Sequence, residues 1–170
     1  DIVPPIFFCI GSIMELEKHR AGVELKLFNL TTQIVSECGY KLYDVEYIQG
    51  SSTLRVYIMN EETKTAVIED CVAVDRAFSP YCEEESWIPN DFVLEVSSPG
   101  MFRNIKTMEH FVLSVGEIIS LTIFGKLNDL EAENLPSKMK GSKKFRGKLL
   151  SVDDNKFNVE IDGANLELTY

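Results

Sequence analysis

The candidate catalytic residues of this sequence lie around a Ser-Ser-Pro-Gly turn. Glu95, Ser97, Ser98 and Arg103 lie in or beside this turn. A hydrolase would need a nucleophile beside a general base, or two carboxylates that converge. The sequence supplies no such base, and it lacks a Gly-x-Ser-x-Gly elbow, a phosphate-binding loop and a dinucleotide fingerprint. We therefore interpret Glu95 as a strand residue and the serines as turn residues, and predict that the protein is not an enzyme.

A second candidate site is a basic cluster near the C-terminus. Its members are Lys138, Lys140, Lys143, Lys144, Arg146 and Lys148. Phe145 lies among them and could stack on a base of RNA. Alternatively, the lysines face water in a solvated loop and Phe145 packs into the core. The sequence leaves both interpretations open, and the first predicts an RNA-binding site.

Three consecutive acids, Glu83, Glu84 and Glu85, follow a predicted helix. Negative charge at the C-terminal end of a helix opposes the helix dipole, so we expect the triplet to lie in a protruding loop. Such a loop could bind a strongly basic protein. The alternative is that the three acids only keep the protein soluble, because runs of like charge usually face solvent.

Soft metal ligands are few and scattered. Cys9, Cys38, Cys71 and Cys82 form no Cys-x-x-Cys pair, and the two histidines match no ligand spacing with them. We interpret the cysteines as small buried hydrophobic residues in a reducing compartment. The sequence therefore predicts no disulfide, no metal and no cofactor.

The charge of the chain is strongly acidic and unevenly divided. The net charge is −10, and residues 1–115 hold 18 acidic and 9 basic residues, against 9 and 8 in residues 116–170. A protein that binds nucleic acid by bulk electrostatics needs an excess of Lys and Arg. The acid excess of the first part instead favours a partner that is itself basic.

The pattern of apolar residues along the chain predicts two domains of an α+β protein. In the first domain, residues 21–116, a helix, a two-stranded hairpin, a second helix, a third strand and a third helix are expected. Their predicted extents are Val23–Cys38, Tyr40–Ile48 and Thr53–Met59, a helix from Glu69 that Pro80 should stop or kink, Asp91–Ser97, and a helix capped by Thr107. This is enough for a small open sheet with helices over one face.

The second domain, residues 117–170, shows short strands only. They are predicted at 118–124, 144–152, 156–161 and 165–169, and Asp162-Gly163 is a strong hairpin signal. Several short strands with tight turns are typical of a small barrel.

Residues 1–20 are predicted to be an N-terminal extension that need not be ordered and that lies outside both domains. Residues 2–14 are apolar, but no basic residue precedes them, Pro4 and Pro5 interrupt them, and they are too short to span a bilayer. We expect neither a signal peptide nor a membrane anchor.

Several motifs in order along the chain resemble one known family. Residues 39–47 and 54–58 resemble the first hairpin of the RimP family of ribosome maturation factors, and Glu69-Asp70-Cys71 resembles the start of its second helix. Residues 94–100 resemble the signature of that family, and residues 145–149 with Asp162-Gly163 are similar to its barrel strands. The signature residues are Glu95, Ser97, Ser98, Pro99, Gly100 and Arg103.

The resemblance implies a KH-like N-terminal α/β domain with a three-stranded sheet, followed by an SH3-like or Sm-like barrel. It implies a cytoplasmic, monomeric factor for late maturation of the small ribosomal subunit, with no catalytic residues. The implied partners are the immature small subunit, a very basic ribosomal protein near the decoding centre, and small-subunit rRNA. The sequence has no Gly-x-x-Gly tetrad, so the usual KH grip on nucleic acid is not expected.

The sequence departs from the family pattern in three places. Residues 101–105 replace the usual Leu-Asp-Arg-Pro-Leu, Pro80 interrupts the second helix, and the chain stops at Tyr170 before the usual last barrel strand, so a barrel open at one edge is expected. The alternative function is an Sm/SH3-like adaptor that binds RNA or peptides outside ribosome biogenesis.

Overall fold

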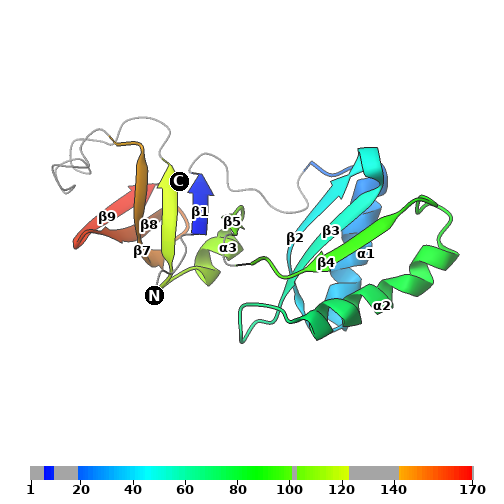
Figure 1. Cartoon of the computed structure of the whole chain (residues 1–170). Helices are drawn as coiled ribbons and strands as arrows, with labels where there is room; N and C mark the ends of the chain where they lie inside the picture. Colours follow the sequence, from blue (N-terminus) through cyan, green and yellow to red (C-terminus); the bar gives the residue numbers. More distant parts are fainter. Residues whose placement is uncertain (1–5, 10–18, 101–102, 123–141, 170) are drawn as a thin grey trace. The chain divides into compact units, whose positions relative to one another are not determined.

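The structure is a computed structural model that describes residues 6–9, 19–100, 103–122 and 142–169 (Figure 1). The chain forms two compact units. One, the N-terminal unit, consists of residues 16–100. The other, the C-terminal unit, consists of residues 1–15 together with residues 101–170. The fold is α+β, as the sequence predicts.

The N-terminal unit is a three-stranded sheet covered on one face by two helices. Its elements are α1 (Gly22–Glu37), β2 (Lys41–Ile48), a 3-10 turn (Gln49–Ser51), β3 (Thr53–Met59), α2 (Ile68–Glu84) and β4 (Val93–Ser97). The strand order is β2-β3-β4, with β2 and β3 antiparallel and β3 and β4 parallel. The sheet is therefore mixed, and β2 and β4 are its edge strands.

Local sequence signals account for these elements. Leu27, Ile34 and Val35 recur at helical spacing on α1 and are buried in the core between helix and sheet. Gly39 ends the helix with φ +82°, a left-handed conformation that glycine adopts without steric cost. The hairpin, the third strand and the first helix that the sequence predicts are confirmed.

The second helix does not end at Pro80, where the sequence predicts a stop or a kink. It continues through this residue to Glu84. Pro80 lies on the exposed side of the helix, where its ring meets solvent and water can replace the lost backbone hydrogen bond. On the opposite side, Val74 and Phe78 are fully buried, and this packing holds the helix together past the proline.

Asp70 holds the start of α2. Its carboxylate accepts a hydrogen bond of 3.0 Å from the backbone N–H of Val67 and one of 2.7 Å from the hydroxyl of Tyr40. These two bonds lower the pKa of Asp70, the bond to the Val67 backbone more than the bond to Tyr40. A carboxylate in the first turn also favours the helix dipole.

We expect Asp70→Asn to reduce the loss of stability in acid. The pKa of Asp70 is lower in the folded chain than in the unfolded chain. Its contribution is therefore present above the ordinary pKa of an aspartate and is lost as the pH falls through the lower folded value. Urea unfolding at about pH 6 and about pH 2 should show a smaller difference for the variant than for the wild type. Glu62→Gln, at an exposed site, is the control.

The C-terminal unit is built on a six-stranded sheet. Its elements are β1 (Ile6–Cys9), β5 (Asn104–Ile105), α3 (Met108–Leu113), β6 (Ile118–Thr122), β7 (Lys144–Val152), β8 (Lys156–Ile161) and β9 (Ala164–Thr169). The strand order is β5-β1-β6-β7-β8-β9. β6 to β9 form an antiparallel meander, while β1 pairs in parallel with both β5 and β6.

The domain limits differ from those expected in two respects. Residues 6–9 form a strand inside the sheet of the C-terminal unit, although the sequence predicts an extension outside both domains. The two units divide between residues 100 and 101, so β5 and α3 belong to the C-terminal unit instead of the first domain. Parallel pairing joins segments far apart in the chain, which no local pattern reveals.

The core of the C-terminal unit contains Phe111 of α3 and inward residues of β6 to β9. Phe111 and Phe157 are fully buried, and their ring centroids lie 5.1 Å apart. Thr107 caps α3 by accepting a hydrogen bond of 3.1 Å from the backbone N–H of His110, as the sequence predicts. The described strands run from one edge, β5, to the other, β9, and are compatible with a barrel-like domain.

In the described part of the chain, every helix is too short or too polar to cross a membrane.

Candidate functional site

A stripe of three bases runs along the outer face of β7. Residues of β7 alternate between buried and exposed, and Lys144, Arg146 and Lys148 fall on the exposed side. We call these three residues the basic stripe. The neighbouring strand β6 places Thr122 opposite Lys144 and Ser120 opposite Arg146, so hydroxyl groups flank the stripe.

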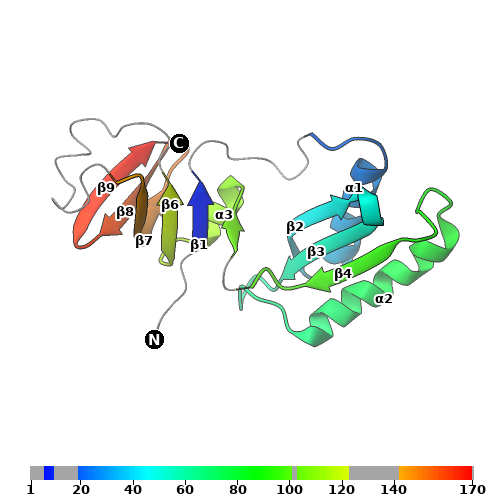
Figure 2. The same cartoon turned by 45° about the horizontal axis from the view of Figure 1, so that its top comes forward.

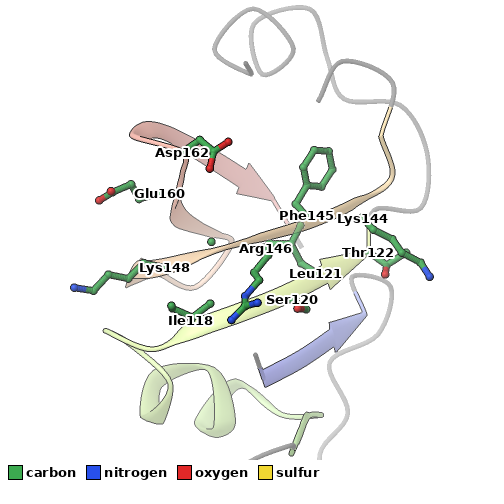
Figure 3. Close-up of a pocket in the computed structure, with 11 residues that line it drawn as sticks. Ile118, Ser120, Leu121, Thr122, Lys144, Phe145, Arg146, Lys148, Glu160 and Asp162 are labelled. Atoms are coloured by element: carbon green, nitrogen blue, oxygen red, sulfur yellow. The ribbon is translucent and has the colours of Figure 1, made fainter. Parts of the chain in front are cut away.

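The basic stripe lines a shallow hollow of about 760 Å³ on this face (Figure 3). Ile118, Ser120 and Thr122 form one side of the hollow, and Glu160 and Asp162 lie on the side of β8 and the β8–β9 turn. Lys and Arg supply hydrogen-bond donors and positive charge, which suits phosphate oxygens. The two carboxylates restrict an anionic ligand to the β6 side of the stripe.

Phe145 also lines the hollow, but it contributes little to its surface. Its side chain is 4% exposed and belongs to the hydrophobic core of the C-terminal unit. Of the two interpretations left open by the sequence for Phe145, this burial favours packing in the core over stacking on RNA. Lys143 is exposed directly before β7, while Lys138 and Lys140 lie outside the described residues. The described part of the cluster is therefore a strand face, not a solvated loop.

The acidic triplet lies at the C-terminal end of α2. Glu83 and Glu84 are the last two residues of the helix, and Glu85 caps it. The expectation of a protruding loop is thus wrong for two of the three residues, because Pro80 does not end the helix. Glu85 accepts a hydrogen bond of 2.7 Å from the indole Nε1 of Trp87, and the ammonium group of Lys26 lies 5.4 Å from the centre of that ring.

The triplet lines a hollow of about 490 Å³ between α2 and the segment that leads into β4. Phe78, Ile88 and Phe92 supply apolar walls beside the carboxylates. The last turn of α2 contains no basic residue, so the negative end of the helix dipole adds to the charge of the triplet. The hollow can therefore hold a cationic side chain with an aliphatic stem, such as Lys or Arg.

The signature residues do not form a catalytic cluster. The carboxylate of Glu95 accepts a hydrogen bond of 2.7 Å from Nε of Arg55 on the neighbouring strand, and the side chains of Arg55 and Glu95 are 42% and 50% exposed. That hydrogen bond raises the pKa of Arg55. Ser97 ends β4, and Ser98 and Pro99 lead to Gly100, whose φ of +72° requires glycine. Arg103 belongs to the other unit.

The cysteines are only partly as predicted. Cys38 and Cys71 are half-buried against the core of the N-terminal unit, as expected, but Cys82 is exposed. Partial desolvation of the sulfur raises the pKa of both thiols, helped by Asp70 beside Cys71 and by Asp75 and Glu83 beside Cys82. Both thiols therefore stay protonated and are poor nucleophiles at neutral pH. Within the described ranges, no three His, Cys, Asp or Glu residues come together as metal ligands could.

Comparison with protein-family models gives one match. Residues 30–102 match the family model described as the RimP N-terminal domain. The matched range begins within α1, contains the hairpin, α2 and β4, and ends just after the signature turn. This range contains the hairpin, second-helix and signature motifs that resemble the family, so the resemblance is confirmed for this part of the chain. The barrel motifs at residues 145–149 and 162–163 lie outside the match.

Proposed function

Because the match over residues 30–102 places this chain in the RimP family, a family of ribosome maturation factors, we propose that the protein assists maturation of the small ribosomal subunit by binding. The family match is the observation that carries the proposal. In this proposal the protein is a monomer that holds a basic ribosomal protein and neighbouring rRNA in the immature particle. RimP is not a known family of enzymes, and we assign the protein no reaction.

Two surfaces of opposite charge support this mode of action. The acidic triplet at the end of α2 suits a basic ribosomal protein, and complementary charge speeds such an encounter. The basic stripe on β7, flanked by Ser120 and Thr122, suits the phosphates of rRNA. The two surfaces lie on different units, and in this proposal one binds the protein and the other binds the RNA.

The proposal is tested by sucrose-gradient co-sedimentation of the purified full-length chain with immature small subunits, mature small subunits and large subunits. We expect binding to immature small subunits that weakens with salt. Equal binding to all three particles, or binding to none of them, would contradict the proposal. Binding to free short RNA without binding to any particle would favour the adaptor function instead.

We expect the triple variant Lys144→Gln, Arg146→Gln, Lys148→Gln to bind immature subunits with a weaker dependence on salt. If each base contacts one phosphate, the slope of log K against log salt should fall by about 2 to 3. The control exchanges three bases of the N-terminal unit, Lys41, Lys64 and Arg76, for Gln and changes the net charge equally. An equal loss of slope in the two triple variants would show that the stripe makes no specific contact with RNA.

A further inference from the structure

A groove runs along the open edge of the sheet in the N-terminal unit, between β4 and α2. It consists of two hollows that meet at Asp75 and Leu94. One, of about 600 Å³, lies near the N-terminal end of α2, and the other is the hollow of about 490 Å³ at its C-terminal end. Figure 2 shows α2 running beside β4 along the whole strand. We call this surface the edge groove.

The backbone of β4 offers hydrogen bonds to this groove. Among the described strands, β4 pairs only with β3, in parallel register. The N–H of Val93 donates to the carbonyl of Ser52 over 3.0 Å, so Val93 points its backbone groups toward β3. Because these groups alternate along a strand, Leu94 and Val96 point theirs to the open edge. Such an edge is a template for another strand.

The groove is apolar near the N-terminal end of α2. Val67, Ile68 and Val72 line it and are 55%, 78% and 39% exposed. Across from them, the half-buried side chains of Leu94 and Val96 turn toward the helix. Large aliphatic side chains that are exposed together beside a strand edge are more typical of a binding surface than of a surface that faces only solvent.

The groove is acidic near the C-terminal end of α2. Glu83, Glu84 and Glu85 line this end, and Asp75 lies where the two hollows meet. Among the described residues that line either hollow, several are acidic and none is Lys or Arg. A ligand of this groove therefore needs aliphatic side chains at one end and positive charge at the other.

We propose that the edge groove binds an extended, basic segment of a partner protein by strand addition to β4. The backbone of the segment pairs with Leu94 and Val96, its aliphatic side chains lie against Ile68 and Val72, and its Lys or Arg side chains meet Glu83 and Glu84. This assignment rests on the proposed function, which supplies a basic ribosomal protein as the partner.

Two other occupants fit the groove less well. A helix satisfies its own backbone hydrogen bonds and would leave those of Leu94 and Val96 unused, whereas strand addition uses main-chain bonds for affinity and side chains for selectivity. A second copy of this chain carries the same net charge of −10 and the same acidic end, so pairing of two copies would bring like charges together.

The test uses the isotope-labelled full-length chain and a synthetic ten-residue peptide of four Lys followed by alternating Val and Thr. We expect the peptide to bind, and the exchange of the Leu94 and Val96 amide protons to slow at least tenfold at saturation. The outer edge of β2 in the same protein is the internal control. A peptide with the same side chains but with N-methyl groups on alternate residues cannot pair as a strand and should not bind.

Matched variants assign the two ends of the groove. Ile68→Ser should weaken peptide binding about tenfold, the loss expected for one buried aliphatic side chain, while Val112→Ser, at an exposed valine of α3, should not. The pair Glu83→Gln, Glu84→Gln should weaken binding and reduce its dependence on salt. The pair Glu61→Gln, Glu62→Gln, exposed before α2, should leave both unchanged.

Four results would overturn the proposal. They are protection of the Leu94 and Val96 amides in the free chain, equal binding of the N-methylated peptide, equal binding of a peptide with Glu in place of Lys, and sedimentation of the free chain as a dimer that Ile68→Ser dissociates. No ribosomal particle is present in these measurements. If the chain co-sediments with immature subunits but does not bind the peptide, strand addition alone is contradicted. If it binds the peptide but does not co-sediment, the proposed function is contradicted.

Discussion

We expect Phe78→Ala to lower the free energy of unfolding of the N-terminal unit by about 3–5 kcal/mol, the range for removal of a fully buried aromatic ring. Phe78 is 0% exposed and lies in the core between α2 and the sheet. Phe78 also lines the hollow of about 490 Å³ beside the acidic triplet. Removal of the ring leaves a cavity beneath the last turns of α2, which carry Glu83 and Glu84. It also removes one of the two buried side chains, Val74 and Phe78, that pack this Pro80-containing helix on the sheet.

The measurement is urea unfolding followed by the fluorescence of Trp87, the one tryptophan of the chain, which lies in this unit. Val72→Ala, on the same helix but at a side chain 39% exposed, is the matched control and should cost less than about 1 kcal/mol. Equal costs for the two variants would mean that α2 does not pack on the sheet through Phe78.

We expect Gly147→Ala to destabilise the C-terminal unit by about 1–3 kcal/mol, the usual cost of forcing extra atoms into a packed site. A Cβ at residue 147 would lie 2.5 Å from the carbonyl oxygen of Glu160 and 2.6 Å from Cγ1 of Val159. The carbonyl is part of the β7–β8 ladder and cannot move aside without opening it. Glycine within a strand often marks such a close approach of another backbone.

Amide hydrogen exchange measured residue by residue reports this effect. In Gly147→Ala, protection should fall at Phe157 and Val159 of β8, while the N-terminal unit keeps its protection. Gly50→Ala is the control, because no atom lies within 4 Å of its added Cβ. Unchanged protection along β8 would show that β7 and β8 are not in this close contact. Weaker pairing of β8 would also shift the basic stripe, because β7, which carries the stripe, would lose its partner strand.

The candidate surfaces were predictable from sequence only as groups of residues. The acid triplet and the basic cluster are visible as runs of like charge, but their placement follows from packing. Phe145 is interleaved with bases, yet the alternation of β7 turns it into the core. The sequence predicts a loop at Glu84, yet burial of Val74 and Phe78 extends α2 beyond Pro80 to that residue.

The edge groove had almost no signal in the sequence. Val67 and Ile68 precede the acids at the start of α2, and their type alone predicts burial. Their exposure follows only from the structure, in which the opposite face of α2 packs on the sheet. Likewise, the alternation of Leu94 and Val96 predicts a strand, but only the strand order places that strand at the edge of the sheet.

The α+β class, the extents of most helices and strands, the turn at Gly100 and the family resemblance follow from the amino-acid sequence alone. Helical spacing, alternation and turn chemistry act between near neighbours in the chain. The tertiary structure was needed to show that residues 6–9 join β5 and β6, that β4 pairs only with β3 among the described strands, and that the stripe and the triplet lie on separate units. These features depend on pairings between segments far apart in sequence. Such pairings are selected by the burial of whole faces, which no short window of residues contains.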